Sequence, residues 1–375
     1  MKVVFTGGGS GGHFYPIIAI AEKLNELLDR EKFVDVKIYY LSDAPYDERI
    51  LFEKGIIFKK LPAGKLRRYF SFLNIVDLFK TVYGVVRALG VLYVLFPDVV
   101  VGKGGYASFP TLIAAKFLNI PVIIHESDSV PGRANIIASK FARRIAVSYR
   151  EAAEYFPIEK TAFTGNPIRR DVAIPMREGA HEILKLDSTV PTILILGGSQ
   201  GASIINDAIM QAAPRLTEKY QIIHQVGIKN LEAMKNMAEV VMAKSQYRER
   251  YKMFGYLNEI TLRTSAGVAD LVISRAGSAI FEIAAWGIPS IIIPITDSNG
   301  DHQRKNAYAY ARGGGCIVIE ESNLTTNLIT SEVERLMDDA EIREKMKVSA
   351  KLFAKDDAAL KIAQEILLVL KEHAK

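Results

Sequence analysis

The sequence is poor in the residues that form disulfides and metal sites. Its 375 residues include one cysteine, Cys316, so no internal disulfide can form, and a reducing cytosol is the compartment that this predicts. The six histidines form no H-E-x-x-H motif and no Asp-x-Asp pair occurs, so we expect no metal site. The N-terminus turns glycine-rich too soon for the apolar core of about 7–15 residues that a secretory signal needs. The remaining composition, 49% hydrophobic and 24% charged, is that of a globular chain long enough for two domains.

The excess positive charge lies entirely in the first half of the chain. Residues 1–160 hold 22 Lys and Arg against 16 Asp and Glu, an excess of 6, whereas the 26 and 26 in residues 161–375 cancel. The densest segment is 59–70, KKLPAGKLRRYF, with five basic residues and no acidic one. Such a segment attracts the phosphates of lipids, nucleic acid or a phosphorylated substrate, and a solvated loop is an equally open interpretation.

An apolar helix is predicted directly after this basic segment. Residues 74–96 carry polar or glycine residues at near-helical spacing, which leaves a narrow polar stripe on a mostly apolar helix. Lys80, Arg87 and the Pro97-Asp98 pair interrupt the run, so we predict no membrane span. Packing between a sheet and a neighbouring element is the favoured arrangement, and a helix that offers its edge to a membrane is the alternative.

The order strand, glycine loop, helix occurs in both halves of the chain. Residues 3–6, the glycines of 7–12 and a helical pattern over 15–28 form the first instance, and 192–196, 197–201 and a helix through 204–209 form the second. Further short apolar strands are predicted at 36–41, 99–101, 122–124, 145–147, 222–225, 271–274 and 291–294. Strands alternating with helices indicate a doubly wound α/β fold.

We therefore predict two tandem Rossmann-like domains with a cleft between them, onto which both glycine loops open. The turn-rich segment 164–167 marks the join, giving an N-terminal domain of residues 1–163 and a C-terminal domain of 164–355. An amphipathic helix within 356–375 is expected to pack back on the first domain. Two facing domains of this kind suit the joining of two substrates.

A glycine loop between a strand and a helix exposes backbone N–H groups to an anion. The pattern Gly7-x-Gly9-x-x-Gly12 matches a dinucleotide fingerprint, which expects an acidic residue about 20 positions on to hold the ribose. Asp35 stands at the start of the next predicted strand and Asp43, at its end, is farther away, so a nicotinamide-dependent enzyme is the rival interpretation. A Walker loop is excluded because no Gly-Lys-Ser/Thr follows either glycine loop.

A second polar cluster follows two strands of the C-terminal half. SRAGS, residues 274–278, leads into a helix that carries Glu282, whose carboxylate can accept hydrogen bonds from a ribose diol or simply favour the helix N-terminus. The run 301–307, DHQRKNA, follows another buried strand. His13 at the first glycine loop and His125 after a strand are the acid–base candidates, with a structural role as the alternative for each.

Eight motifs occur in order over nearly the whole chain: GGGSGGHFYP, GKLRRYFS, GKGGYASFP, IHES, TGNPIR, LGGSQGA, SRAGS with its downstream Glu282, and GDHQRKNA. Together they closely resemble the MurG family of peptidoglycan glycosyltransferases, which have the GT-B architecture. The resemblance implies inverting transfer of N-acetylglucosamine from UDP-N-acetylglucosamine to the C4 hydroxyl of the muramyl sugar of lipid I, giving lipid II. It implies UDP-N-acetylglucosamine as co-substrate, no cofactor and no metal.

The resemblance also implies roles for particular residues. Leu257 would meet the uracil through its backbone, Glu282 would bond the ribose, and Gln303 and Asn306 beside His302 would hold the sugar. His13 would be the general base, Glu282 the second catalytic residue, and Tyr106 would line the acceptor side. The implied donor-binding set is Ser10, Gly11, Gly12, Asp128, Arg169, Ser199, Leu257, Gly277, Ser278, Ala279, Glu282, Gln303 and Asn306.

The resemblance also implies contact with a membrane, and the sequence departs from the family motifs at two places. Lys65, Arg67 and Arg68 would dock a peripheral enzyme on the anionic cytoplasmic face of the cell membrane, in contact with other cell-wall synthesis and division proteins and with no nucleic acid. Asp128 stands where the pattern predicts an asparagine, and the spacing from Arg275 to Glu282 is one residue short. The alternatives are another GT-B transferase, a UDP-N-acetylglucosamine 2-epimerase, and a basic adaptor that binds polyanions.

Overall fold

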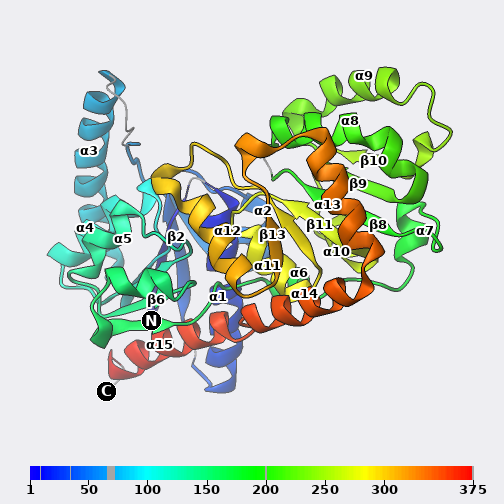
Figure 1. Ribbon diagram of the computed structural model, residues 1–375. Coiled ribbons are helices and arrows are strands. Elements are labelled where there is room, and N and C mark those ends of the chain that lie inside the picture. The colour runs from blue at the N-terminus through cyan, green and yellow to red at the C-terminus, as the bar shows by residue number, and fades with distance from the viewer. Residues whose placement is uncertain (9, 34, 66–71, 199–200, 374–375) are drawn as a thin grey trace. The chain divides into compact units, whose positions relative to one another are not determined.

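The protein, described here by a computed structural model, divides into two compact units, each built on one parallel sheet (Figure 1). Unit 1 comprises Met1–Arg169 and Lys355–Lys375, and unit 2 comprises Arg170–Ala354. The structure describes all residues except 9, 34, 66–71, 199–200 and 374–375. The predicted α/β fold with two parallel sheets is confirmed.

Unit 1 contains a seven-stranded sheet in the order β3-β2-β1-β4-β5-β6-β7. Its strands are β1 (Lys2–Thr6), β2 (Lys37–Ser42), β3 (Ile56–Lys60), β4 (Val99–Gly102), β5 (Val122–Glu126), β6 (Arg144–Val147) and β7 (Thr161–Phe163). Its α-helices are α1 (Gly11–Arg30), α2 (Glu48–Glu53), α3 (Phe72–Leu95), α4 (Phe109–Phe117), α5 (Arg133–Ser139) and α15 (Ala358–His373). The inner strands are buried on both faces, which is why they read as continuous apolar runs.

The helix α15 completes the core of unit 1 although it follows unit 2 in the chain. It packs against α1 below the sheet (Figure 1), with Ile362, Ile366 and Leu370 in the same apolar cluster as the strands β1 and β4. At its end, Lys371 pairs with Glu31 at 2.8 Å. Burial of these side chains contributes about 1.5–3 kcal/mol each.

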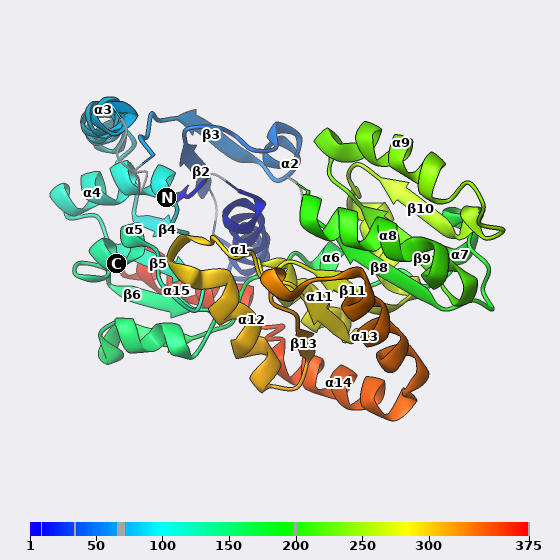
Figure 2. The ribbon, with the colours of Figure 1, turned by 45° about the horizontal axis from the view of Figure 1, so that its top comes forward.

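For the helix α3, the favoured interpretation was a helix packed between a sheet and a neighbouring element. This interpretation was wrong. Only 22% of the window Ile75–Leu95 is buried, and this window, with mean hydropathy 1.6, is long and apolar enough to cross a membrane by length and composition alone. Seen along its axis in Figure 2, α3 lies at the outside of unit 1 beside α4. Its inner face carries Gly84 and the buried side chains of Ala88, Leu92 and Leu95, and a Cβ on Gly84 would lie 2.1 Å from the Pro62 carbonyl oxygen.

The outer face of α3 is formed by large apolar side chains. Phe79 is 71% exposed and Val94 is 80% exposed, whereas Ala88 is fully buried. The hydroxyl of Thr81 accepts a hydrogen bond from the Gly64 N–H at 3.2 Å, so part of the predicted polar stripe faces the protein. The helix therefore buries a narrow strip of glycine and apolar residues and exposes further large apolar side chains around it.

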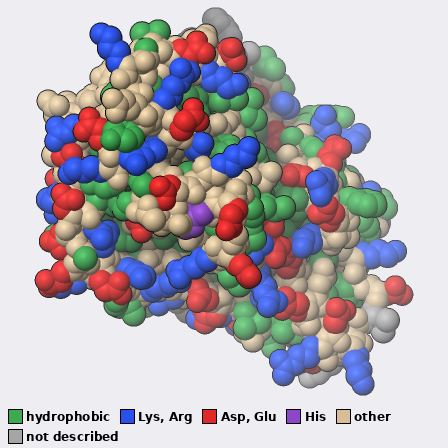
Figure 3. All heavy atoms as spheres, turned by 90° about the vertical axis from the view of Figure 1, so that its right-hand side faces the viewer, with side chains coloured by type: hydrophobic (Ala, Val, Ile, Leu, Met, Phe, Trp, Pro, Cys, Tyr) green, Lys and Arg blue, Asp and Glu red, His purple; other side chains and the backbone are tan. Residues whose placement is uncertain are grey.

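Unit 2 contains a six-stranded sheet in the order β10-β9-β8-β11-β12-β13. Its strands are β8 (Thr192–Leu196), β9 (Gln221–Gln225), β10 (Tyr251–Phe254), β11 (Ala269–Ser274), β12 (Ser290–Ile292) and β13 (Cys316–Val318). Its α-helices are α6 (Arg170–Ala173), α7 (Ala180–Leu184), α8 (Ser203–Lys219), α9 (Leu231–Val241), α10 (Glu259–Val268), α11 (Ala279–Trp286), α12 (His302–Arg312), α13 (Thr326–Asp338) and α14 (Ala340–Phe353). The side that carries α7 and α9 shows basic and acidic side chains interspersed (Figure 3), as expected from the balanced charge of residues 161–375.

Local sequence fixes several helix ends. The side chain of Asn258 accepts a hydrogen bond from the Thr261 N–H at 2.9 Å, and Asp339 accepts one from Ile342 at 2.9 Å. These are N-caps, each of which stabilises a helix by about 1 kcal/mol. Gly287 ends α11 with a positive φ of 68°, and a Cβ there would strike the Lys351 side chain. Glycine is therefore required at this position.

The segment 164–169 lies in unit 1, whereas the sequence predicts the join after residue 163. The Gly165 N–H donates to the Val147 carbonyl at the end of β6, and its own carbonyl oxygen lies 3.1 Å from Nε2 of His125. These bonds extend unit 1 to Arg169.

Candidate functional site

The order of strands in each sheet reverses at one point, and glycine loops follow the strands there. In unit 1 the reversal lies between β1 and β4, and in unit 2 between β8 and β11. Ligands of open parallel sheets bind beyond the carboxyl ends of strands at such a point. Each unit therefore has one expected ligand-binding edge, and most of the predicted site residues lie on these two edges.

The loops after β1 and β4 approach each other closely. A Cβ on Gly105, whose φ is +78°, would lie 2.6 Å from the Gly8 carbonyl oxygen. A Cβ on Gly8 would lie 2.5 Å from Oγ of Ser42. Neither position tolerates a side chain, so the two loops fit together as bare backbone.

His13 lies in the first turn of α1, next to both loops. Its Nδ1 is 3.2 Å from the carbonyl oxygen of Lys103. Because a carbonyl oxygen only accepts, this bond assigns the proton to Nδ1 in the neutral ring and leaves Nε2 as the nitrogen that can take up a proton. Ser10, the N-cap residue of α1, makes no side-chain capping bond, and Gly11 and Gly12 form the first helical residues.

Tyr106 and Arg169 are each held by neighbours on unit 1. The Tyr106 hydroxyl donates to Oδ2 of Asp43 at 2.5 Å, and Nζ of Lys65 lies 5.0 Å from the ring centroid. Burial, and then the hydrogen bond and charge of Asp43, raise the pKa of Tyr106, so its hydroxyl stays protonated. The guanidinium of Arg169 lies 4.2 Å from the ring centroid of Tyr15 on α1, one turn from the first glycine loop.

The carboxylate of Glu126 organises the loop that carries Asp128, a role that the sequence did not reveal. Its Oε1 accepts from the N–H groups of Ser127 at 2.8 Å and Asp128 at 3.0 Å. Its Oε2 accepts from the Gly132 N–H at 3.0 Å and from Nδ2 of Asn135 at 2.9 Å. Burial, and next the charge of Asp128, raise the pKa of this carboxyl group, while the hydrogen bonds lower it.

His125 is a structural residue in this arrangement. Its ring is fully buried, and Nε2 lies 3.1 Å from the Gly165 carbonyl oxygen. Burial, and next the charge of Lys103, hold the pKa of His125 well below its ordinary value, so the ring stays neutral.

In unit 2 the loop after β11 leads into the N-terminus of α11. Gly277 has open space at its Cβ position, and Ser278 is the N-cap residue without a capping bond from its side chain. Ala279 is the first residue of α11, and Glu282 lies in its first turn, half-buried. Nδ2 of Asn306, which is almost fully buried, donates to the Ala276 carbonyl at 3.2 Å and so ties α12 to this loop.

The segment between β12 and α12 is anchored by a partly buried ion pair. Nη2 of Arg275 lies 2.5 Å from Oε1 of Glu321, and Oε2 of Glu321 accepts from the Thr296 N–H at 2.9 Å. Within the same segment, Oε1 of Gln303 accepts from the Ile295 N–H at 3.2 Å. Gln303 is thereby held beside the carboxyl end of β12, and His302 precedes it at the start of α12.

Of the other predicted residues, one has a buried side chain and three lie outside the described part of the chain. Leu257 is 2% exposed in the apolar core of unit 2, so only its backbone can meet a ligand. Ser199, Arg67 and Arg68 lie outside the described residues. Within the described part of the chain, no three His, Cys, Asp or Glu side chains converge.

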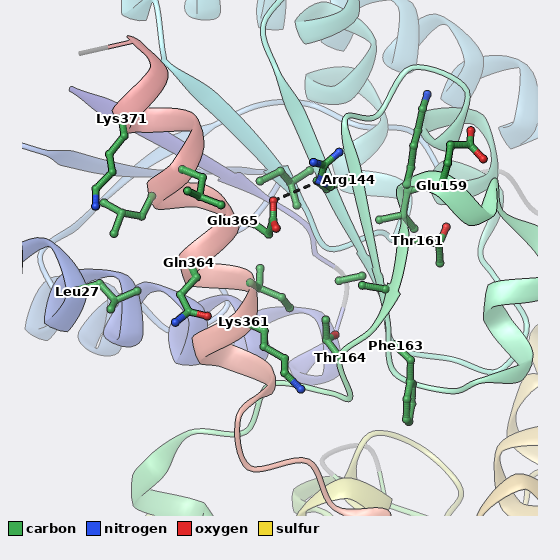
Figure 4. Close-up of a pocket in the computed structure, with 18 of the residues that line it drawn as sticks. Leu27, Arg144, Glu159, Thr161, Phe163, Thr164, Lys361, Gln364, Glu365 and Lys371 are labelled. Carbon is green, nitrogen blue, oxygen red and sulfur yellow. Dashed lines mark ion pairs between the residues drawn. The ribbon is translucent and has the colours of Figure 1, made fainter. Parts of the chain in front are cut away.

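A groove of about 860 Å³ lies elsewhere on unit 1, between α15 and the strands β6 and β7. Figure 4 shows its walls, with Arg144 and Glu365 pairing across it at 3.4 Å. None of the predicted site residues lines it. Size alone therefore does not identify the functional site of this unit.

Two doubly wound parallel-sheet units in one chain, each with a glycine loop at its switch point, are the GT-B architecture. Residues 3–147 match the glycosyltransferase family 28 N-terminal domain, and residues 192–362 match the glycosyltransferase family 28 C-terminal domain. The chain belongs to glycosyltransferase family 28.

Within this family the chain is similar to N-acetylglucosamine transferases. It is 38% identical over 369 residues, 97% of this chain and 99% of the other, to the UDP-N-acetylglucosamine--N-acetylmuramyl-(pentapeptide) pyrophosphoryl-undecaprenol N-acetylglucosamine transferase 2 of Bacillus cereus. The crystal structure of MurG from Acinetobacter baumannii superposes with a TM-score of 0.73 at 25% identity, covering 99% of both chains. A UDP-N-acetylglucosamine 2-epimerase structure, with 15% identity, a TM-score of 0.71, and 99% and 96% of the two chains covered, shares the fold alone.

The Arg275–Glu321 pair generates a testable prediction about stability. Burial alone would raise the pKa of Glu321, but the hydrogen bonds from Thr296 and Arg275 and the Arg275 charge together lower it below its ordinary value of 4.5. A carboxyl group whose pKa is lowered by folding stabilises the protein above that ordinary value and loses this effect as the pH falls through the lower pKa. Glu321→Gln should therefore cost about 1–3 kcal/mol of unfolding free energy at pH 7.

Thermal unfolding of both proteins between pH 3 and pH 8 checks this. The gap in Tm should close in the acid range. Glu341→Gln is the matched control, because Glu341 forms an exposed pair with Lys345 and should change Tm little. A gap that persists unchanged at pH 3 would contradict the ionic role of Glu321.

Proposed function

We propose that this protein transfers N-acetylglucosamine from UDP-N-acetylglucosamine to the C4 hydroxyl of the muramyl sugar of lipid I, giving lipid II on the cytoplasmic side of the cell membrane. The observation that carries the proposal is the 38% identity over 369 residues to a transferase whose name states this donor and this acceptor. The ligand-binding edges of both units support it, because they display the loops and polar side chains that a sugar diphosphate requires.

In this proposal unit 2 holds the donor. The N–H groups at the start of α11 and of α8 favour the diphosphate, and Glu282 accepts hydrogen bonds from the ribose hydroxyls. Gln303, placed beside the end of β12, bonds the sugar. Asn306 acts on the same loop through its bond to the Ala276 carbonyl.

Unit 1 supplies the base in this proposal. Inverting transfer needs a group that removes the proton of the attacking C4 hydroxyl as the bond to the sugar forms and UDP departs. Nε2 of His13 is suited to this, because the Lys103 carbonyl fixes the proton on Nδ1. We propose that helix N-termini and Arg169, rather than a metal ion, stabilise the leaving diphosphate. The sequence supports this in having no Asp-x-Asp pair.

The proposal predicts that His13→Ala lowers turnover and spares donor binding. Removal of a general base lowers kcat by about 10²–10⁴-fold, while the Kd for UDP-N-acetylglucosamine should stay within about twofold because His13 holds no donor atom in this scheme. Release of UDP in the presence of a lipid I analogue measures turnover, and calorimetry measures the Kd for UDP-N-acetylglucosamine.

His181→Ala, on α7 of unit 2, is the matched control and should keep full turnover. Unchanged turnover in His13→Ala would remove His13 as the base. Formation of UDP-N-acetylmannosamine without a lipid acceptor would instead support a 2-epimerase.

Glu282 provides a second prediction, on donor affinity. Hydrogen bonds to a charged acceptor contribute about 1.5–3 kcal/mol, so Glu282→Ala should weaken UDP binding about 10–150-fold. Isothermal calorimetry with UDP measures this. Glu232→Ala, which removes another first-turn glutamate of a unit 2 helix, should bind UDP like the unchanged protein. Equal affinity in Glu282→Ala would refute the ribose contact.

The exposed apolar face of α3 provides a third prediction, on membrane binding. We propose that this face, next to the basic segment 59–65, inserts between anionic lipids. Burial of a large apolar side chain contributes about 1.5–3 kcal/mol, so Phe79→Ser should weaken binding to anionic vesicles at least about tenfold.

Co-sedimentation with phosphatidylglycerol vesicles measures this binding. Phe52→Ser, the same change at an 87% exposed position on α2, is the matched control and should bind normally. Equal loss in both variants, or in neither, would contradict docking through α3.

A further inference from the structure

Lys103 is a buried cation to which neither the family resemblance nor the proposed mechanism assigns a role for its side chain. It follows β4 directly and is 1% exposed. Within the described part of the chain, its Nζ has no hydrogen-bond partner. A buried ammonium group without a hydrogen bond costs free energy, so its presence requires an explanation outside packing.

The backbone of Lys103 is fixed by the surrounding edge of the sheet. Its N–H donates to the Thr6 carbonyl at 2.8 Å, and its carbonyl oxygen meets Nδ1 of His13 at 3.2 Å. A Cβ on Gly7 would lie 3.1 Å from the Lys103 Cβ, so the side chain is confined beneath the first glycine loop. The ammonium group cannot turn away to solvent without moving this loop.

The charged groups that act on the Lys103 ammonium are two carboxylates. Burial lowers the pKa of Lys103 to about 8, and the charges of Glu126 and Asp128 oppose this shift. His125 from β5, which stays neutral, and His13 from α1 are the other titratable groups of the cluster. The protonated cluster of one lysine and two carboxylates has a net charge of one negative unit.

The loop after β5 requires the ionised form of Glu126. All four groups that bond this carboxylate are donors: the N–H groups of Ser127, Asp128 and Gly132, and Nδ2 of Asn135. A protonated carboxyl group would turn a donor toward donors, because only its ionised form accepts at all its lone pairs. Without the ammonium group, the charge of Asp128 would raise the pKa of Glu126 further, and this carboxyl group would take up a proton.

We propose that Lys103 is a positioning residue whose buried ammonium group balances the charges of Glu126 and Asp128 and so holds the loop 126–132 in the form that presents Asp128 to the sugar donor. The last clause rests on the proposed function, and the charge balance does not. The pairing explains why this chain carries a carboxylate at 128, where the family pattern predicts an asparagine. The positive charge at 103 balances the negative charge at 128.

The test is a double-mutant cycle with two variants of nearly unchanged shape. Lys103→Met should lower kcat/KM about 30-fold, within the range of coupling free energies of contacting residues. Asp128→Asn should lower it about threefold. The double variant restores one negative unit of charge, so it should be more active than Lys103→Met alone. Lys37→Met, on an exposed position of β2, is the matched control and should leave kcat/KM unchanged.

The pH dependence of the cycle separates charge balance from packing. The coupling between positions 103 and 128 should be full at pH 6.5 and should shrink as the ammonium group loses its proton near pH 8. A purely structural role of Lys103 predicts a coupling that does not change with pH. The Tm of Lys103→Met should fall at pH 6.5, because the variant leaves the buried carboxylate of Glu126 without the cation that balances it.

Carboxyl ¹³C NMR measures the ionisation of the carboxyl groups in this cluster without any substrate. At pH 6 the Glu126 carboxyl group should be ionised in the unchanged protein, protonated in Lys103→Met, and ionised again on addition of Asp128→Asn. Additive kinetic effects together with identical carboxyl ionisation would overturn the proposal. Absence of lipid I-dependent UDP release by the unchanged protein would instead overturn the proposed function, and the NMR result would still decide the role of Lys103.

Discussion

The close contact of two bare backbone loops determines the architecture of unit 1. The loops after β1 and β4 meet where a Cβ on Gly105 would lie 2.6 Å from the Gly8 carbonyl oxygen. This contact places His13 beside the Lys103 carbonyl and confines the Lys103 side chain beneath it. Because the switch point of the sheet lies between these strands, this close backbone contact lies at the expected ligand position.

Both units shape their ligand-binding edge with a carboxylate that accepts from backbone N–H groups. Glu126 does so after β5 in unit 1, and Glu321 holds the segment after β12 in unit 2. Each carboxylate is accompanied by a cation, Lys103 in one unit and Arg275 in the other. Arg275 bonds its partner directly, whereas Nζ of Lys103 makes no hydrogen bond in the described part of the chain. The loops that carry function are thus held by charge, since few apolar side chains are available there.

The sequence predicts the inner strands well because burial on both faces leaves continuous apolar runs. It misses the edge strands β3, β7, β10 and β13, whose partly exposed residues produce no such run. The placement of α3 fails for a different reason. Large apolar residues such as Phe79 and Val94 are exposed although others are buried, so the apolar pattern does not mark the face that packs. The pairing of Arg275 with Glu321 joins residues 46 positions apart, and no local pattern marks it. The glycine loops, His13 and Glu282 can be proposed as site residues from the sequence alone, because their residue types carry backbone or acid–base chemistry.

The packing of α15 on α1 makes unit 2 an insertion within unit 1. During synthesis on the ribosome, the contiguous residues of unit 2 are all available before unit 1 is complete. Until α15 emerges from the ribosome, the apolar surface of α1 in unit 1 stays uncovered. The nascent chain therefore carries an unfinished sheet domain while unit 2 is synthesised, and unit 1 is completed only when α15 emerges.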